Sequence, residues 1–178
     1  MNARHSHDSN QWYTPSEYVE AARTVLRGID LDPASHEEAQ MGIRAAYYYT
    51  EHDNGLEQDW TGRIFLNPPG GLVVEFWEKL LRSDVSAAIW IGYSLEQLQT
   101  LQSSGYPSPI EYPICIPSRR IAFVESSSKQ LTRMAKLRLQ GKDPNAKSSP
   151  THANYITYIG PETGLFLEVF SRFGAVRL

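Results

Sequence analysis

Short apolar runs of strand-like composition alternate along this chain with amphipathic segments of helical period. Strands are predicted at residues 29–31, 47–50, 64–66, 87–92, 120–125 and 154–160, and after Gly174. Helices are predicted between them at residues 16–26, 36–46, 74–81, 95–101, 129–141 and 162–173. This alternation predicts an α/β fold of Rossmann-like type: one compact domain with a mostly parallel, twisted sheet and helices on both faces.

The sequence also predicts the limits of the domain, the ends of its first helix and one insertion. Residues 1–11 lack an apolar period and predict a disordered tail, which leaves residues 12–178 for the domain. Ser16 is the expected cap of the first helix, and Gly28 is expected to end it. Residues 118–152 are rich in Lys, Arg, Ser and Gln and predict a basic, mobile insertion in the domain.

Several classes of protein are disfavoured. No apolar run approaches the roughly 20 residues that span a bilayer, and the N-terminus is polar where a signal peptide is apolar, so we expect a cytoplasmic protein, in the host cell if the gene belongs to a phage. Cys115 is the only cysteine, which leaves no internal disulfide or thiolate cluster, and we expect it in the core. The five histidines have no metal-site spacing, and we expect no metal.

Charge is distributed unevenly along the chain. Between Arg119 and Lys147 only Glu125 and Asp143 oppose eight basic residues, so this segment carries a formal charge of +6 and the rest of the chain −9. Such a block typically faces a polyanion, most often nucleic acid, although a solvated charged loop is the alternative. The predicted DNA-binding residues are Arg119, Arg120, Lys129, Arg133, Lys136, Arg138, Lys142 and Lys147.

Two of the predicted strands end in polar groups. The first is followed by Asp32-Pro33, and the strand at 64–66 is followed by Asn67-Pro68-Pro69. Ligands of open α/β sheets bind at the carboxyl ends of strands. Proline holds the residue before it extended and has no N–H. The amide oxygen of Asn67 and the carbonyl of Pro68 therefore form a stiff pair of hydrogen-bond acceptors, unless the prolines only end the strand.

An amino group with two hydrogens is the natural complement of such a pair. The exocyclic amino group of a nucleobase is a poor nucleophile, because its lone pair is delocalised into the ring. Two acceptors that hold both N–H bonds out of the ring plane localise that lone pair and aim it at an electrophile. This chemistry needs no strong base, and the sequence shows no convincing Ser/His/Asp or Cys/His constellation.

The chain resembles the phage and prophage DNA N-6-adenine methyltransferases, which use S-adenosyl-L-methionine. The resemblance runs from about Trp12 to the C-terminus and depends on the order and spacing of short motifs. These are "WYTP" at 12–15, "IDLDPAS" at 29–35, "YYT" at 48–50, "DNGL" at 53–56 with Trp60, "GRIFLNPPGG" at 62–71, "FW" and "KL" within 76–80, "RIAF" at 120–123 and "SPTHANYITYIG" at 149–160. It implies a class I methyltransferase fold and methylation of the adenine amino group in double-stranded DNA.

The resemblance also implies roles for individual residues. The base-activating motif is Asn67, Pro68, Pro69 and Gly70. The implied cofactor residues are Thr14 and Pro15 in one wall, Asp32 and Pro33 against the methionine end, and Asp53 or Asn54 at the adenine of the cofactor.

The chain departs from the family pattern at Gly70, where relatives usually carry an aromatic residue on which the target base stacks. Stacking contributes about 1–3 kcal/mol per base, so Tyr93 or another aromatic residue is needed as a substitute. The glycine-rich turn of many methyltransferases is also absent after Asp32, as it is in this family.

Three alternatives remain open at the level of sequence. The same acceptor pair serves methylation of the cytosine amino group. Gly70 is compatible with an inactive DNA-binding relative of the same fold. RNA is a third substrate to consider, because a single-stranded base needs no flipping. In each case sequence preference is expected to come from the loops at 118–152, because the chain has no room for a separate recognition domain.

Overall fold

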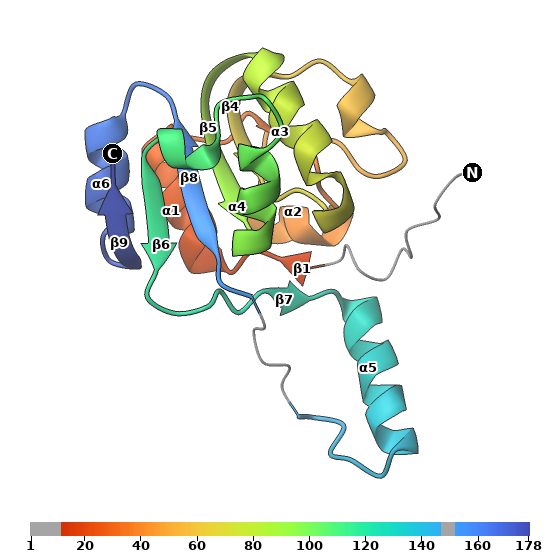
Figure 1. Ribbon diagram of the computed structural model, residues 1–178. Helices are drawn as coiled ribbons and strands as arrows, with labels where there is room; N and C mark the ends of the chain where they lie inside the picture. Colours follow the sequence, from red (N-terminus) through yellow and green to blue (C-terminus); the bar gives the residue numbers. More distant parts are fainter. Residues whose placement is uncertain (1–11, 147–151) are drawn as a thin grey trace.

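A seven-stranded sheet forms the centre of the molecule in the computed structural model, which describes residues 12–146 and 152–178 (Figure 1). The disordered tail predicted for residues 1–11 lies outside this range. The strands of the sheet are β2 (Leu31–Asp32), β3 (Tyr47–Tyr48), β4 (Thr61–Leu66), β5 (Asp84–Gly92), β6 (Ile114–Pro117), β8 (Tyr155–Ile159) and β9 (Gly174–Arg177).

The sheet is mixed. Its order is β3-β2-β4-β5-β8-β6-β9; the pairings from β3 to β5 are parallel, and those from β5 to β9 are antiparallel. The α/β prediction is therefore confirmed, but "mostly parallel" was wrong as a description of the pairing. The reason is that β8 and β9 run against the other strands: β8 lies between β5 and β6, and β9 pairs with β6 at the edge of the sheet.

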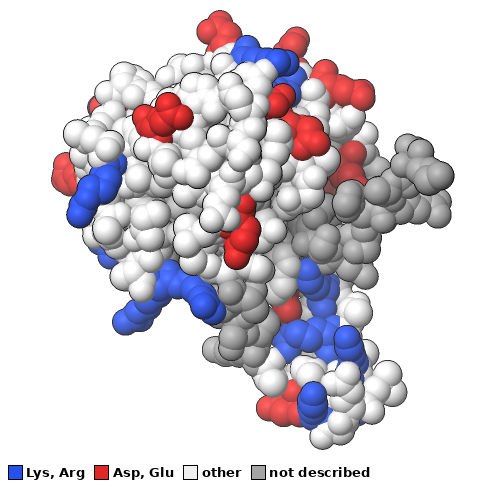
Figure 2. Space-filling model, in the orientation of Figure 1, with Lys and Arg blue, Asp and Glu red and all other residues white. Residues whose placement is uncertain are grey.

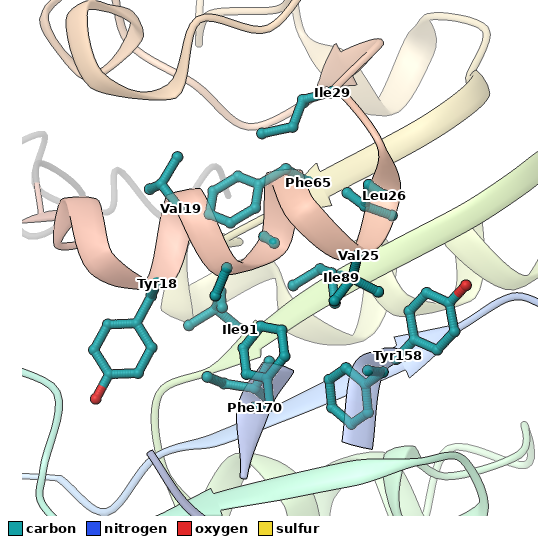
Figure 3. Close-up of a cluster of buried hydrophobic side chains, with 14 of the residues drawn as sticks. Tyr18, Val19, Val25, Leu26, Ile29, Phe65, Ile89, Ile91, Tyr158 and Phe170 are labelled. Carbon is teal, nitrogen blue, oxygen red and sulfur yellow. The ribbon is translucent and has the colours of Figure 1, made fainter. Parts of the chain in front are cut away.

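Apolar side chains fill both faces of the sheet. Along β5, Ile89 and Ile91 belong to one buried cluster while Ala88 and Trp90 belong to the other, as the period of two requires. Helices α1 (Ser16–Leu26) and α6 (Thr163–Phe170) cover the first face, where Phe65 meets side chains of α1 (Figure 3). Helices α3 (Val73–Arg82) and α4 (Leu95–Gln102) cover the second.

The helix predictions are confirmed to within a few residues, with one error of detail. Pro15, not Ser16, stands at the N-cap of α1, and its carbonyl accepts the N–H groups of Tyr18 and Val19. Pro15 suits this place because its ring fixes φ and it has no N–H to satisfy. Helix α2 (Glu37–Ile43) is shorter than predicted and ends at Arg44, which adopts the left-handed conformation.

The strand predictions fail around residues 113–125. Strand β6 was not predicted, because Pro113 precedes it and Pro117 is its last residue; its Cys115 is buried, as expected. Of the strand predicted at 120–125, only β7 (Val124–Glu125) forms. It pairs with β1 (Trp12–Tyr13) in a separate two-stranded ribbon, whereas Ile121 enters the core and donates its N–H to Asn154 Oδ1 at 2.8 Å.

We call residues 118–146 the arm: its first part, with Ile121, packs on the body, and its helix α5 projects away from the body (Figure 1). Its helix α5 (Ser127–Leu139) confirms the helix predicted at 129–141, and none of its residues is buried. Leu131, Met134 and Leu137, predicted to share one face, are exposed or half-buried. Within the described residues, no helix is long and apolar enough to cross a membrane.

Candidate active site

The carboxyl ends of β2, β4 and β5 open into one cavity of about 700 Å³. The residues predicted from the two strand ends meet there: Asp32 ends β2 and Pro33 follows it, and Asn67 and Pro68 follow β4. Segments distant in sequence complete it. The further lining residues used below are Trp12, Tyr13, Thr14, His36, Asn54, Pro69, Gly70, Phe76, Tyr93, Phe123, His152 and Asn154.

Asn67 stands at the point where β4 leaves the sheet, and its side chain is oriented by β1. The amide Nδ2 donates to the main-chain carbonyl of Trp12 at 3.3 Å. Among the described residues none donates to Oδ1 of Asn67, so this oxygen retains its capacity to accept. Pro68 is buried and Pro69 is extended, at φ −63° and ψ 134°. The acceptor pair expected from the sequence therefore has a stiff backbone and a fixed amide orientation.

Asp32 is a buried carboxyl group in the cavity wall, with only 2 % of its surface exposed. Burial raises its pKa to about 7, although hydrogen bonds from Ser35, from the Ala34 N–H and from Gln40 act in the opposite direction. Gln40 Nε2 donates to Asp32 Oδ2 at 3.0 Å and thereby ties α2 to the end of β2. Asp32 thus presents a carboxyl group whose charge changes near neutral pH and favours a cationic ligand.

Thr14 is the second indication of a ligand. Its side chain lines the cavity and is 7 % exposed, and its Oγ1 has no hydrogen-bond partner in the part of the chain that the structure describes. A buried hydroxyl without a partner is unfavourable, so a polar ligand group stabilises it.

Two residues predicted to bind the cofactor do not line the cavity. Pro15 serves as the N-cap of α1. The carboxylate of Asp53 is exposed and accepts hydrogen bonds from the N–H and Oγ1 of Thr50, at 2.8 and 2.7 Å, which also hold its pKa below the usual range. Of the pair Asp53 and Asn54, the structure therefore places Asn54 at the cavity.

The chain matches the family model described as DNA N-6-adenine-methyltransferase (Dam) over residues 2–137. It belongs to this family. The enzymes of the family methylate N6 of adenine in DNA, and nothing in the comparison favours cytosine, RNA or an inactive relative. No curated protein and no solved structure matches the chain. The matched range contains both strand-end motifs and most of the arm, and it ends before the predicted motif at 149–160.

The basic residues predicted to bind DNA lie on the arm of this methyltransferase, outside the cavity. In the view of Figure 2, most acidic side chains lie on the upper part of the body and several basic ones on the arm below. Arg119, Arg120, Lys136, Arg138 and Lys142 are exposed. Lys147 lies outside the described residues.

Contacts within the chain hold the base of the arm against the methyltransferase cavity. Ser127 donates from its N–H and its Oγ to the carboxylate of Glu38, at 3.1 and 2.6 Å. Lys129 Nζ lies 4.3 Å from the centre of the Trp12 ring. Within the arm, Arg133 of α5 pairs with Glu125 of β7 at 2.7 Å. Lys129 therefore helps to hold α5 against the body and Arg133 helps to hold it against β7, roles that the sequence reasoning did not assign to them.

Sequence reasoning also missed cavity residues that only tertiary packing brings in. Trp12, His36 and Asn154 come from the start of the chain, the N-cap of α2 and the segment before β8. The only available signal was that Trp12 and Asn154 fall within short family motifs. Within the described residues, no group of three His, Cys, Asp or Glu side chains is placed to hold a metal ion.

Proposed function

We propose that this methyltransferase binds S-adenosyl-L-methionine in the cavity at the ends of β2 and β4, and methylates N6 of an adenine extruded from double-stranded DNA. The observation that carries the proposal is the proximity of two contrasting walls in one cavity. One contains the acceptors Asn67 and Pro68, and the other contains the buried carboxyl of Asp32 and the unpartnered hydroxyl of Thr14. On this basis the fold is of the class I methyltransferase type.

Asn67 Oδ1 and the Pro68 carbonyl receive the two hydrogens of the adenine amino group. Because Trp12 holds Nδ2 of Asn67, the amide cannot turn to present a donor without losing that hydrogen bond. Both acceptors therefore face the amino group before it arrives, and no reorganisation is needed at the moment of reaction. Bound S-adenosylmethionine supplies the electrophilic methyl group on its sulfonium.

The proton balance needs no strong base. The bond between the methyl carbon and the sulfonium sulfur would break as the C–N bond forms, which leaves S-adenosylhomocysteine. The amino nitrogen becomes positively charged, and it returns to neutrality by losing one of its two original protons to water. Asn67 and Pro68 stabilise that positive charge by accepting its N–H groups. Pro69 and Gly70 complete the motif by setting the direction of the backbone as it leaves the site.

The cofactor residues are those of the opposite wall. We assign Asp32 and Pro33 to the cationic methionine end, Thr14 to a neighbouring polar group, and Asn54 to the adenine of the cofactor. Pro15 acts indirectly, by starting α1 directly after Thr14. Asp53 acts indirectly as well, by closing the turn that precedes Asn54.

The arm is proposed to hold the DNA. Basic side chains at Lys136, Arg138 and Lys142 are exposed and, within the described residues, have no acidic partner. Phosphate contacts by such residues supply affinity without sequence information. We retain the predicted basic insertion at 118–152 as part of a single domain; its residues 147–151 lie outside the described residues.

One measurement tests the identity of the cofactor, the identity of the methylated base and the presence of activity. Purified protein is incubated with S-adenosylmethionine labelled in the methyl group and with unmethylated plasmid DNA, and the DNA is then digested to nucleosides. Labelled N6-methyl-2′-deoxyadenosine is the expected product. Labelled N4-methyl-2′-deoxycytidine, or no labelled nucleoside in the presence of calorimetrically detected cofactor binding, would contradict the proposal. Single-stranded DNA and RNA of equal length serve as competing substrates.

A further inference from the structure

Gly70 and Tyr93 fit against each other at the edge of the proposed base site. Gly70 follows Asn67-Pro68-Pro69 directly and is the first residue of a short 3₁₀ turn. It does not have a positive φ, so the backbone does not require glycine here. A Cβ at this position would instead lie 2.9 Å from Cε1 of Tyr93 and 3.3 Å from its Cζ. The phenol ring of Tyr93 occupies the space in which a side chain at position 70 would begin.

Hydrogen bonds at both ends of the residue fix the backbone of Tyr93. It follows β5 immediately, next to the end of β4. Its N–H donates to Gln97 Oε1 at 3.1 Å, and its carbonyl accepts from Nδ2 of the buried Asn154 at 3.0 Å. The ring is half-buried and lines the cavity, with the His152 imidazole perpendicular to it at 5.2 Å between centroids. Tyr93 is therefore a rigidly placed aromatic ring with part of its surface open.

The other candidate aromatic residues of the cavity are occupied by contacts of their own. Trp12 lies under the ammonium group of Lys129. The Tyr13 hydroxyl donates to Glu38 at the base of the arm. Phe76 is buried and stacks on Trp60 at 5.7 Å, and Phe123 is half-buried and packs against the core cluster of α1 and α6. Tyr93 is the ring that adjoins the acceptor motif itself.

We propose that Tyr93 is the surface on which the target adenine stacks, and that Gly70 is glycine in order to admit its ring. This inference rests on the proposed function, because it needs an extruded base whose amino group meets Asn67 and Pro68. Enzymes that extrude a base hold it by hydrogen bonds at its edge and by stacking against aromatic or apolar side chains. Asn67 and Pro68 supply the first of these, and Tyr93 supplies the second from a different strand.

The first test compares three substitutions at one position with a matched control. Tyr93→Ala and Tyr93→Leu remove the aromatic face and should lower kcat/KM for DNA by about tenfold or more, the order that base stacking contributes. Tyr93→Phe keeps the ring and should therefore retain most of the kcat/KM of the parent. Tyr47→Ala removes an exposed tyrosine of the edge strand β3 and should match the parent. Calorimetric binding of S-adenosylmethionine to every variant checks that the protein is folded.

The second test moves the ring from one position to the other. Gly70→Tyr alone should lower kcat/KM, because its Cβ displaces Tyr93. Gly70→Tyr combined with Tyr93→Ala places one ring beside the acceptor motif again. The kcat/KM of this double variant should be higher than that of Tyr93→Ala alone, so the effects of the two changes on kcat/KM are not additive.

The experiments distinguish an error in the proposed function from an error in the role of Tyr93. A parent enzyme that forms no N6-methyladenine overturns the proposed function and this inference with it. An active parent in which Tyr93→Leu behaves like Tyr47→Ala overturns the inference alone. The same holds if Tyr93→Phe is as impaired as Tyr93→Leu, because the hydroxyl would then be the functional group.

Discussion

The side-chain amide of Asn67 donates to the main-chain carbonyl of Trp12 across 3.3 Å. This contact joins the end of a central strand to the first described residues of the chain and determines which end of the amide faces the cavity. The oxygen is left to accept, as activation of an amino group requires. Residues 12–14 therefore contribute to the site in two ways: Trp12 orients Asn67, and the side chain of Thr14 lines the cavity itself.

Asn67→Ala tests this arrangement. It removes one of the two acceptors and leaves the cofactor wall unchanged, so kcat for DNA methylation should fall by at least about 100-fold, the order found when one preorganised hydrogen-bonding group is removed. Affinity for S-adenosylmethionine should stay near that of the parent. Gln99→Ala, which removes an exposed carboxamide of α4 outside the cavity, is the matched control. A loss of activity below about tenfold would mean that Asn67 only shapes the turn.

Asp32→Ala separates cofactor binding from DNA binding. Removal of the buried carboxylate should weaken the binding of S-adenosylmethionine, measured by calorimetry, by about tenfold or more, because the cationic end of the cofactor loses its partner. DNA binding without cofactor should persist in a gel-shift measurement. Asp84→Ala, an exposed aspartate at the start of β5 and thus at the opposite edge of the sheet, is the control. If the two variants bind the cofactor equally, Asp32 only forms the turn before Pro33.

Asp32→Asn tests the pKa of the same group in the protein without cofactor. Burial raises that pKa from 3.8 to about 7, so the folded state retains the proton over a range in which the unfolded chain has lost it. The contribution of Asp32 to stability is therefore largest below about pH 4 and is lost as the pH rises to about 7. The free energy of unfolding of Asp32→Asn, relative to the parent, should increase across this range by up to about 4 kcal/mol.

Urea denaturation of both proteins at several pH values gives this difference. Carboxylates with lowered pKa values, such as Asp30 and Glu38, change stability in the opposite direction but are common to both proteins. A difference that does not change between pH 4 and 8 would show that Asp32 titrates near its ordinary value.

The sequence predicted those parts of the fold that local patterns determine. Ile64, Phe65 and Leu66 are apolar, adjacent to strand breakers and buried on alternate faces, so the strand and its end were both predictable. Strand β6 was not, because the prolines at its ends argue against a strand, and its two sheet partners β8 and β9 come from distant segments. The mixed pairing of the sheet depends on the direction of these same two partners, β8 and β9.

Some residues of the site were likewise predictable from local sequence, and others depend on tertiary packing. Asn67, Pro68 and Asp32 were identifiable because they follow strands directly, and the carboxyl ends of neighbouring parallel strands meet at one edge. Which residues surround them depends on packing: Asn54 lines the cavity while Asp53 closes a turn, and Tyr93 fills the space above Gly70. No periodicity or spacing in the sequence predicts these contacts.

The last prediction concerns the arm as a DNA clamp. Replacing Lys136, Arg138 and Lys142 with Gln removes three exposed cations and changes no residue of the cavity. Each lost phosphate contact should reduce the dependence of log affinity on log salt concentration by about 0.9 on duplex DNA, so the triple variant should have a slope up to about 2.7 smaller and a weaker affinity at low salt. Titration of a labelled duplex at several salt concentrations measures both quantities.

A second triple variant distinguishes a clamp from a general effect of charge. Arg27, Arg44 and Arg177 are exposed and lie outside the arm, the first two directly after α1 and α2 and the third at the end of β9. Their replacement with Gln changes the net charge by the same amount. Because electrostatic contacts with DNA are local at physiological salt, where the screening length is about 8 Å, this variant should keep the salt slope of the parent. Equal slopes in all three proteins would remove the clamp hypothesis and leave the basic residues of the arm as a solvated surface.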